Sequence, residues 1–185
     1  MSEAIRNPIS PPWYVWLAVI TVVGFILHEF AHWLAGTLLG FDMMMSLNRA
    51  WAIGSPSISE QSNFLIVLAG PVATIAIAAV GLVLVYQRAS IIGYAMVLSS
   101  FAMRCLAFGA SVFSPNDEAK ISAYFGLPWY SAFLVTCSIL FVMLVLAIRR
   151  LSIRWTTHVI SYFVLSVTFA AVVFGDAELL KIMWA

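Results

Sequence analysis

Five consecutive residues near the N-terminus, His28-Glu29-Phe30-Ala31-His32, form an H-E-x-x-H motif inside an apolar segment. Residues four apart lie on the same face of an α-helix, so the two imidazoles can share one tetrahedral metal ion. Glu29 lies about 100° around the helix from His28, where its carboxylate can take a proton from water at the metal. This arrangement is typical of zinc hydrolases, which combine two neutral imidazoles, a general base and open positions for water and substrate.

A purely structural role is the alternative for histidines on an apolar helix, and two observations weigh against it. The chain has 3 His among 185 residues, so random placement would produce this motif with odds on the order of one in a thousand. Ionisable groups at membrane depth also cost roughly 2.5–3.5 kcal/mol each on insertion scales. Because the motif has three such groups side by side, it needs a compensating partner, and a metal ion is one.

The composition indicates an integral membrane protein. Of the 185 residues, 63% are hydrophobic and 9% are charged, and the mean hydropathy is +1.02. Such a chain is expected to cross the lipid bilayer several times, in the inner membrane if the cell is bacterial. The formal net charge of +1 and the lack of a basic tract give no indication of nucleic-acid binding. The sequence does not determine the oligomeric state.

Five apolar segments are long enough to cross a bilayer, which predicts an all-α polytopic membrane protein with about five transmembrane helices. One membrane-embedded domain over residues 13–174 is expected between an irregular N-terminal lead-in (1–12) and a mixed tail (175–185). The expected transmembrane helices are 13–40, 63–86, 91–113, 129–148 and 157–174.

The connection after the first helix, residues 41–62, contains two short strand-like runs. They predict a small membrane-associated β-hairpin, and a plain connecting loop is the alternative. With five crossings, this connection, the connection 114–128 and the C-terminal tail lie on the same side of the bilayer. His32 lies eight residues before Gly40, at the expected end of the first helix, so a metal would sit roughly 12 Å below that side.

A catalytic zinc ion needs a third protein ligand besides the two histidines. Asp117 is favoured, because it approaches from another segment at an expected helix N-terminus, where backbone N–H groups stabilise an ionised carboxylate. Glu118 is the nearest alternative ligand, and a helix cap is the alternative role of Asp117. Asp42 would need a sharp return of the chain, and no helix is expected around Glu60.

Arg104 lies inside the third apolar segment. An unpaired guanidinium in hydrocarbon is costly, so Arg104 is expected to face the bundle interior or a water-filled pocket. It can pair with Asp117 or Glu118, or it can stabilise the oxyanion that forms during hydrolysis. Asn116 and Glu118 are candidates for the same kind of support, since they flank the favoured third ligand.

Over roughly residues 20–130, the chain resembles the site-2 protease family of intramembrane zinc metalloproteases. The resemblance is carried by the H-E-x-x-H motif, by Ala69-Gly70-Pro71-Val72-Ala73-Thr74, by Asp117 and by the position of the expected hairpin. Thr74 stands where the family usually has Asn, and Asn116-Asp117-Glu118 stands where Leu-Asp-Gly is common. The chain therefore looks like a small, divergent branch of the family without a PDZ domain.

The resemblance implies one Zn²⁺ per chain, held by His28, His32 and Asp117, with Glu29 as the catalytic glutamate. It also implies a protease that hydrolyses a peptide bond in or near a transmembrane segment of a membrane protein, at a site near the cytosolic face. The distribution of Lys and Arg favours the opposite orientation, with five on the N-terminal side against three on the other.

The peptide bonds of a helical substrate are shielded by their own hydrogen bonds, so the substrate must unwind before it is cut. We expect the unwound segment to pair as an added strand with the hairpin. The expected pairing residues are Met43, Met44, Met45 and Ser46.

Two other functions fit the same residues. The chain can be a catalytically silent relative that binds a partner helix, although the retention of Glu29 argues against this, since metal binding needs only the ligands. It can also be a membrane metal-binding protein, although three histidines are too few for the histidine-rich di-iron sites of membrane desaturases. The extended metzincin motif is excluded, because Ala35 and Leu38 occupy the positions of its glycine and third histidine.

Overall fold

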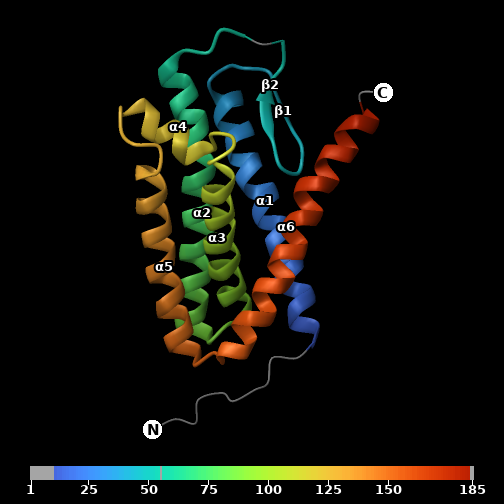
Figure 1. Cartoon of the computed structure of the whole chain (residues 1–185), viewed down its shortest axis with the longest axis vertical. Helices are drawn as coiled ribbons and strands as arrows, with labels where there is room; N and C mark the ends of the chain where they lie inside the picture. Colours follow the sequence, from blue (N-terminus) through green and yellow to red (C-terminus); the bar gives the residue numbers. More distant parts are fainter. Residues whose placement is uncertain (1–10, 55, 184–185) are drawn as a thin grey trace.

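Long apolar helices connect the two ends of the molecule in the computed structural model (Figure 1), which describes residues 11–54 and 56–183. The elements are α1 (Pro11–Leu38), β1 (Met43–Met45), β2 (Ala50–Ala52), α2 (Glu60–Arg88), α3 (Ile91–Ala110), α4 (Asp117–Tyr124), α5 (Ser131–Leu151) and α6 (Trp155–Met183). Five of the helices, all but α4, are long and apolar enough to cross a membrane. The predicted fold class, with a two-stranded antiparallel hairpin after the first helix, is confirmed.

Successive long helices alternate in direction, so the hairpin, α4 and the last part of α6 lie at one end of the molecule (Figure 1). We call this the site end. The turn between α2 and α3 and the turn between α5 and α6 lie at the opposite end. The two connections that the topology places on one side of the bilayer are therefore at the same end of the bundle.

The boundaries of α1 differ from the expected range of 13–40. The helix begins at Pro11, because a proline in the first helical turn loses no hydrogen bond. It ends at Leu38, because Gly40 adopts φ +88° and the N–H of Phe41 donates to the Gly36 carbonyl at 3.1 Å. Six residues separate His32 from this end, so the motif lies roughly 9 Å below it, nearer than expected.

The other long helices differ from their expected ranges as well: α3 ends at Ala110 and not at residue 113, α5 covers Ser131–Leu151 in place of 129–148, and α2 and α6 are extended. α2 begins at Glu60, because the Ser59 side chain caps it and accepts a hydrogen bond from the N–H of Ser62 at 3.1 Å. α6 continues to Met183, so most of the expected mixed tail is helical. Residues 1–10 of the expected lead-in and residues 184–185 of the tail lie outside the described residues.

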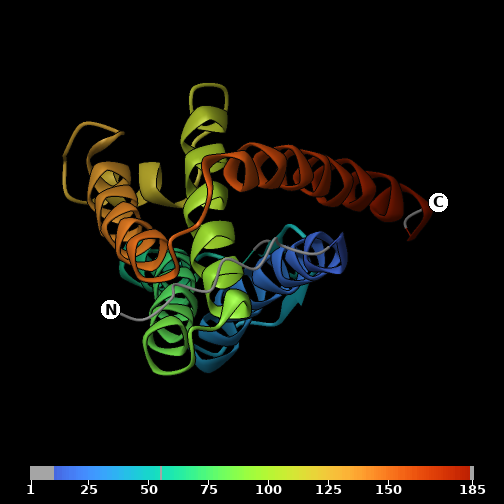
Figure 2. The ribbon, with the colours of Figure 1, turned by 90° about the horizontal axis from the view of Figure 1, so that it is seen from below.

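α3 occupies the centre of the bundle, with α2 and α5 on one side and α1 and α6 on the other (Figure 2). α2 and α3 approach closely where Gly81 faces Gly93, since a Cβ at Gly81 would lie 2.6 Å from the Gly93 carbonyl oxygen. α6 packs against α1 and leans outward (Figure 2). This arrangement places the start of α4, after α3, beside the H-E-x-x-H face of α1.

Candidate metal centre

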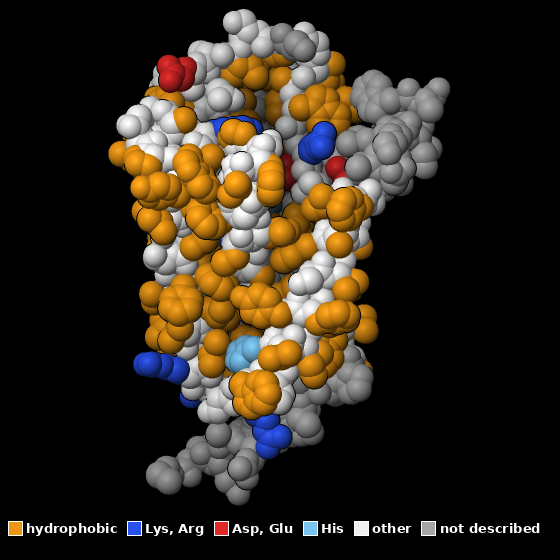
Figure 3. All heavy atoms as spheres, in the orientation of Figure 1, with side chains coloured by type: hydrophobic (Ala, Val, Ile, Leu, Met, Phe, Trp, Pro, Cys, Tyr) orange, Lys and Arg blue, Asp and Glu red, His pale blue; other side chains and the backbone are white. Residues whose placement is uncertain are grey.

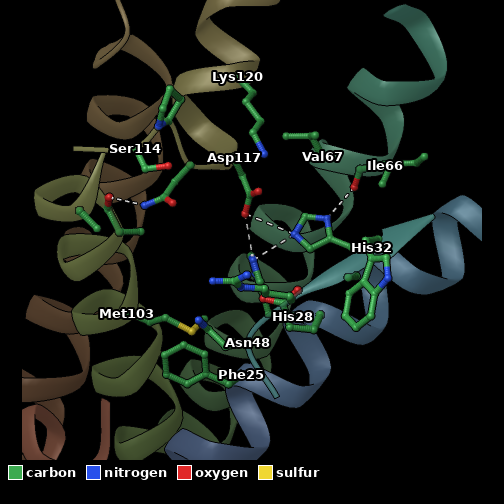
Figure 4. A pocket seen from close by; sticks show the side chains of 18 of the residues that line it. Phe25, His28, His32, Asn48, Ile66, Val67, Met103, Ser114, Asp117 and Lys120 are labelled. Carbon is green, nitrogen blue, oxygen red and sulfur yellow. Dashed lines mark hydrogen bonds and ion pairs between the residues drawn. The ribbon is translucent and has the colours of Figure 1, made fainter. Parts of the chain in front are cut away.

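His28, His32 and Asp117 each bring one ligand atom to a common point between α1 and α4 (Figure 4). The two Nε2 atoms are 3.2 Å apart, and Asp117 Oδ2 lies 3.0 Å from Nε2 of His28 and 3.3 Å from Nε2 of His32. Two ligand atoms bound to a tetrahedral zinc at ~2.0–2.1 Å are themselves roughly 3.3–3.4 Å apart. The triangle is close to that size, so this group can hold a metal ion.

Hydrogen bonds on the far side of both rings fix their tautomers. Nδ1 of His32 lies 2.7 Å from the Ile66 carbonyl, which can only accept, so Nδ1 carries the proton. Nδ1 of His28 lies 3.0 Å from the Thr74 hydroxyl, which donates its own proton to the Gly70 carbonyl at 3.1 Å. The Thr74 oxygen therefore accepts from His28, and both neutral rings direct an unprotonated Nε2 at the metal position.

α2 approaches α1 at this point because Gly70 has no side chain. A Cβ at Gly70 would lie 2.5 Å from Cε1 of His28 and 2.6 Å from Cε1 of His32. Thr74, one helical turn further along, has no exposed surface. Since Thr74 is buried against His28, it supports a ligand and does not face a substrate.

The start of α4 presents Asp117 to the histidines. The side-chain amide of Asn116 donates to the Ala107 carbonyl at 2.7 Å, which ties α4 to the last turn of α3. Asn116 occupies the N-cap position and Asp117 is the first helical residue, so Asp117 is not the cap. Asn116 also lines the pocket at the site, so its amide lies close to the proposed ligand.

Asp117 is held in its ionised form. Burial acts to raise the pKa of its carboxyl, but protons held on the facing Nε2 atoms of His28 and His32 would donate to it and hold the pKa well below its usual range, until a metal ion takes the place of those protons. A carboxylate must be deprotonated to bind a metal ion. The surroundings of Asp117 therefore suit the role of a third ligand.

Glu118 points away from the histidines and pairs with Arg104. Nη1 of Arg104 lies 3.2 Å from Oε1 and 3.4 Å from Oε2 of Glu118, and 3.7 Å from Oδ2 of Asp117. The expected ion pair of Arg104 is therefore present. Glu118 is not among the residues that meet at the metal position, and the other two carboxylates considered, Asp42 and Glu60, are exposed and also lie outside that group.

A pocket of about 1100 Å³ opens onto the three ligands. Glu29 lines it, next to His28 on α1, and so does Arg104. Acidic and basic side chains appear together at the site end between α4 and α6, whereas the flanks below are mostly hydrophobic (Figure 3). The pocket is thus a polar recess in an otherwise apolar surface.

The hairpin forms one wall of the pocket. Two backbone hydrogen bonds of 2.8 Å flank its strands, from Ser46 to the carbonyl of Arg49 and from Ile53 to the carbonyl of Asp42. Because bonded pairs alternate along an antiparallel ladder, Ala50 and Ala52 direct their N–H and C=O groups away from β1. The same alternation directs the backbone N–H and C=O groups of Met43 and Met45 away from β2.

The two edges of the hairpin have different surroundings. All three residues of β2 line the pocket, but Met43 is the sole residue of β1 that does. The outward carbonyl of Met43 accepts a hydrogen bond from Trp33 Nε1 at 3.0 Å. The edge that faces the metal centre is therefore β2, whereas the expected pairing segment, Met43 to Ser46, follows the other edge.

Asp176 has a role that the sequence analysis did not predict. Its buried carboxylate accepts from the Ser46 hydroxyl at 2.8 Å and from the Leu47 N–H at 2.9 Å, so α6 holds the turn of the hairpin. Residue 176 falls in the expected mixed tail, for which the sequence predicts no functional role. A carboxylate directly after a long apolar run was the available signal, since such a group needs a partner.

No protein-family model matches the chain, and no curated protein or solved structure matches it. The similarity to the site-2 protease family therefore rests on the motifs quoted above and remains a prediction.

The choice between the two neighbouring carboxylates can be tested by substitution. Asp117→Asn should lose the bound metal, because the amide is a poor ligand without charge. Glu118→Gln should keep the metal but lose roughly 3 kcal/mol of stability, because the buried Arg104 loses its nearer charged partner and keeps only the Asp117 carboxylate at 3.7 Å. Metal per chain by elemental analysis and unfolding in detergent measure the two effects. Loss of metal in Glu118→Gln with retention in Asp117→Asn would reverse the assignment.

A second substitution tests the support of His28. Thr74→Val removes the acceptor for Nδ1 with little change in volume, so the affinity for Zn²⁺ should fall about 10- to 100-fold. Thr74→Ser keeps the hydroxyl and is the matched control, with an affinity near that of the wild type. Competition with a zinc chelator measures both, and equal affinities in the two variants would contradict the role of Thr74.

Proposed function

We propose that the chain is an intramembrane zinc metalloprotease that hydrolyses a peptide bond in or near a transmembrane segment of a membrane protein. The observation that carries the proposal is the triangle of His28, His32 and Asp117, with Glu29 beside it in one pocket. Two imidazoles and one carboxylate leave an open position, as catalytic zinc sites do. In a bacterium, the protein would lie in the inner membrane.

The residues around the pocket can perform the steps of amide hydrolysis. A bound zinc ion would polarise the scissile carbonyl and lower the pKa of water toward ~7. Glu29 would take the proton of the attacking water and deliver it to the nitrogen of the leaving amine. Arg104, which lines the pocket while paired with Glu118, contributes positive charge near the position where negative charge develops on the carbonyl oxygen.

The position of the pocket favours a membrane substrate. The metal centre lies roughly 9 Å below the end of α1, and the outer faces of the surrounding helices are apolar (Figure 3). The volume of about 1100 Å³ is larger than that of most small-molecule sites. These features suit an extended segment of a transmembrane helix better than a small ligand.

The free edge of β2 gives such a segment a place to bind. Ala50 and Ala52 direct unpaired N–H and C=O groups outward, and both residues line the pocket with the metal ligands. A substrate that adds a strand there would gain main-chain hydrogen bonds in place of those lost on unwinding. We therefore move the proposed pairing edge from Met43–Ser46 to β2.

The alternative functions make less use of the site. A silent relative or a metal-binding protein needs His28, His32 and Asp117 but has no need of Glu29 or of the free edge of β2. A carboxylate buried at membrane depth is costly, so the presence of Glu29 in the pocket favours the protease.

Glu29→Gln separates catalysis from metal binding. The variant should keep one Zn²⁺ per chain and lose cleavage by at least about 100-fold, because the general base is absent while the ligands remain. Purified protein is assayed for zinc and for cleavage of single-span substrates in proteoliposomes, with the wild type as control. A wild type without zinc would refute the proposal, and equal cleavage by the variant would remove Glu29 from the mechanism.

Proline substitutions distinguish the two edges of the hairpin. Ala52→Pro deletes an outward N–H from β2, and Met45→Pro deletes one from β1, without removing a bond between the strands. Only Ala52→Pro should slow cleavage, by roughly tenfold for one lost hydrogen bond, while zinc content stays unchanged. The comparison of kcat/KM for the two variants checks this. If Met45→Pro is the slower enzyme, the substrate pairs with β1.

A further inference from the structure

Three basic side chains at the site end line the pocket, and these are Arg49, Arg104 and Lys120. Among the residues whose side chains the structure describes, the other basic residues lie at the opposite end of the bundle and are Arg88, Arg149, Arg150 and Arg154. The three cations come from three different elements, the hairpin, α3 and α4, so their convergence is a property of the fold and not of one charged stretch.

Of the three cations in the pocket, only Arg104 forms an ion pair with a carboxylate that the structure describes. Arg104 is buried and pairs with Glu118 and Asp117. Arg49 and Lys120 form no ion pair with any described carboxylate, although Asp42 and other acidic residues lie at the same end. Both are exposed, so their charges are available to a molecule that enters the pocket.

Both free cations have defined positions at the mouth of the pocket. Arg49 directly precedes Ala50 of β2, and its carbonyl accepts from the N–H of Ser46, which Asp176 holds in turn. Lys120 lies on α4 one turn after Asp117, and its side chain extends from α4 toward the metal ligands (Figure 4). A strand paired with β2 would run beside Arg49, in the pocket that Lys120 also lines.

We propose that Arg49 and Lys120 bind an acidic side chain of the substrate, which follows the scissile segment on the side of the site end. The inference rests on the proposed protease function and adds a substrate class to it. Once a divalent ion is bound, Glu29 and Asp117 balance its charge and Glu118 balances Arg104, so Arg49 and Lys120 leave the pocket with an excess of positive charge. Such a pocket favours carboxylates and rejects cations.

A lipid phosphate is the other anion that could meet these residues. Clusters of basic residues that bind anionic lipid headgroups typically hold about four to eight Lys and Arg beside the membrane surface. Arg49 and Lys120 instead line the recess that contains the metal ligands. The substrate is therefore the partner that the geometry favours.

Binding of matched peptides tests the proposal without requiring cleavage. The Glu29→Gln protein is placed in nanodiscs of phosphatidylcholine, and three fluorescent single-span peptides are compared that differ only in the residue after the apolar segment, Asp, Asn or Lys. The Asp peptide should bind about tenfold more tightly than the Lys peptide, in the range of a charge-assisted contact. Adding Arg49→Glu and Lys120→Glu together should reverse this order, and Arg88→Glu, at the opposite end, should leave it unchanged.

Three outcomes would overturn the proposal. The peptides can bind equally well to all variants, or the double substitution can weaken all three peptides alike without a change of order. The double substitution can also reduce association of added phosphatidylglycerol while the order of the peptides stays the same, which would identify a lipid contact. Cleavage of the same peptides by the wild type reports separately on the protease function, since cleavage without a charge preference rejects only the present inference.

Discussion

The cost of placing ionisable groups inside an apolar helix bundle is the constraint on which this structure depends. Within the described core, three of the charged groups have partners from another helix: Arg104 of α3 pairs with Glu118 of α4, and Asp117 contacts both histidines of α1. Glu29 is buried as well and forms no ion pair with a described residue, but it lines the pocket. An unpaired charge at this depth would cost several kcal/mol. The contacts that shape the candidate metal centre therefore also hold α1, α3 and α4 together.

The geometry of the candidate metal centre has two sources, the pitch of α1 and the tertiary contacts around the ligands. The helix itself places His28 and His32 on one face, since i and i+4 positions are fixed by its pitch. The remaining degrees of freedom, the rotation of each ring and the approach of the third ligand, are set by tertiary contacts. Thr74 and the Ile66 carbonyl orient the rings, and Asn116 anchors the start of α4. Gly70 makes these contacts of α2 with the histidines possible, because it has no side chain and α2 can lie directly against the rings.

Local sequence patterns, together with the number of membrane crossings, explain what could be predicted from the sequence. The H-E-x-x-H spacing, the five apolar segments and the number of crossings suffice to bring Asp117 near His28 and His32. The role of Thr74 as an acceptor, the edge of the hairpin that faces the pocket and the contact of Asp176 with Ser46 depend on packing between distant segments. Such contacts leave no periodic signal. The predicted end of the last helix, at residue 174, was wrong for a different reason. Good helix formers follow the apolar run, so α6 continues to Met183.

In the proposed protease, the contact between Asp176 and the hairpin would link substrate access to the position of α6. Both carboxylate oxygens of Asp176 are used, one by the Ser46 hydroxyl and one by the Leu47 N–H, so the turn must follow any displacement of this part of α6. β2 follows the turn directly, and it carries the free edge that faces the metal ligands. α6 leans away from the bundle at this end (Figure 1), where a transmembrane substrate would have to enter from the lipid. In the proposed protease, α6 would therefore both border the route of the substrate and hold the hairpin that carries the proposed pairing edge.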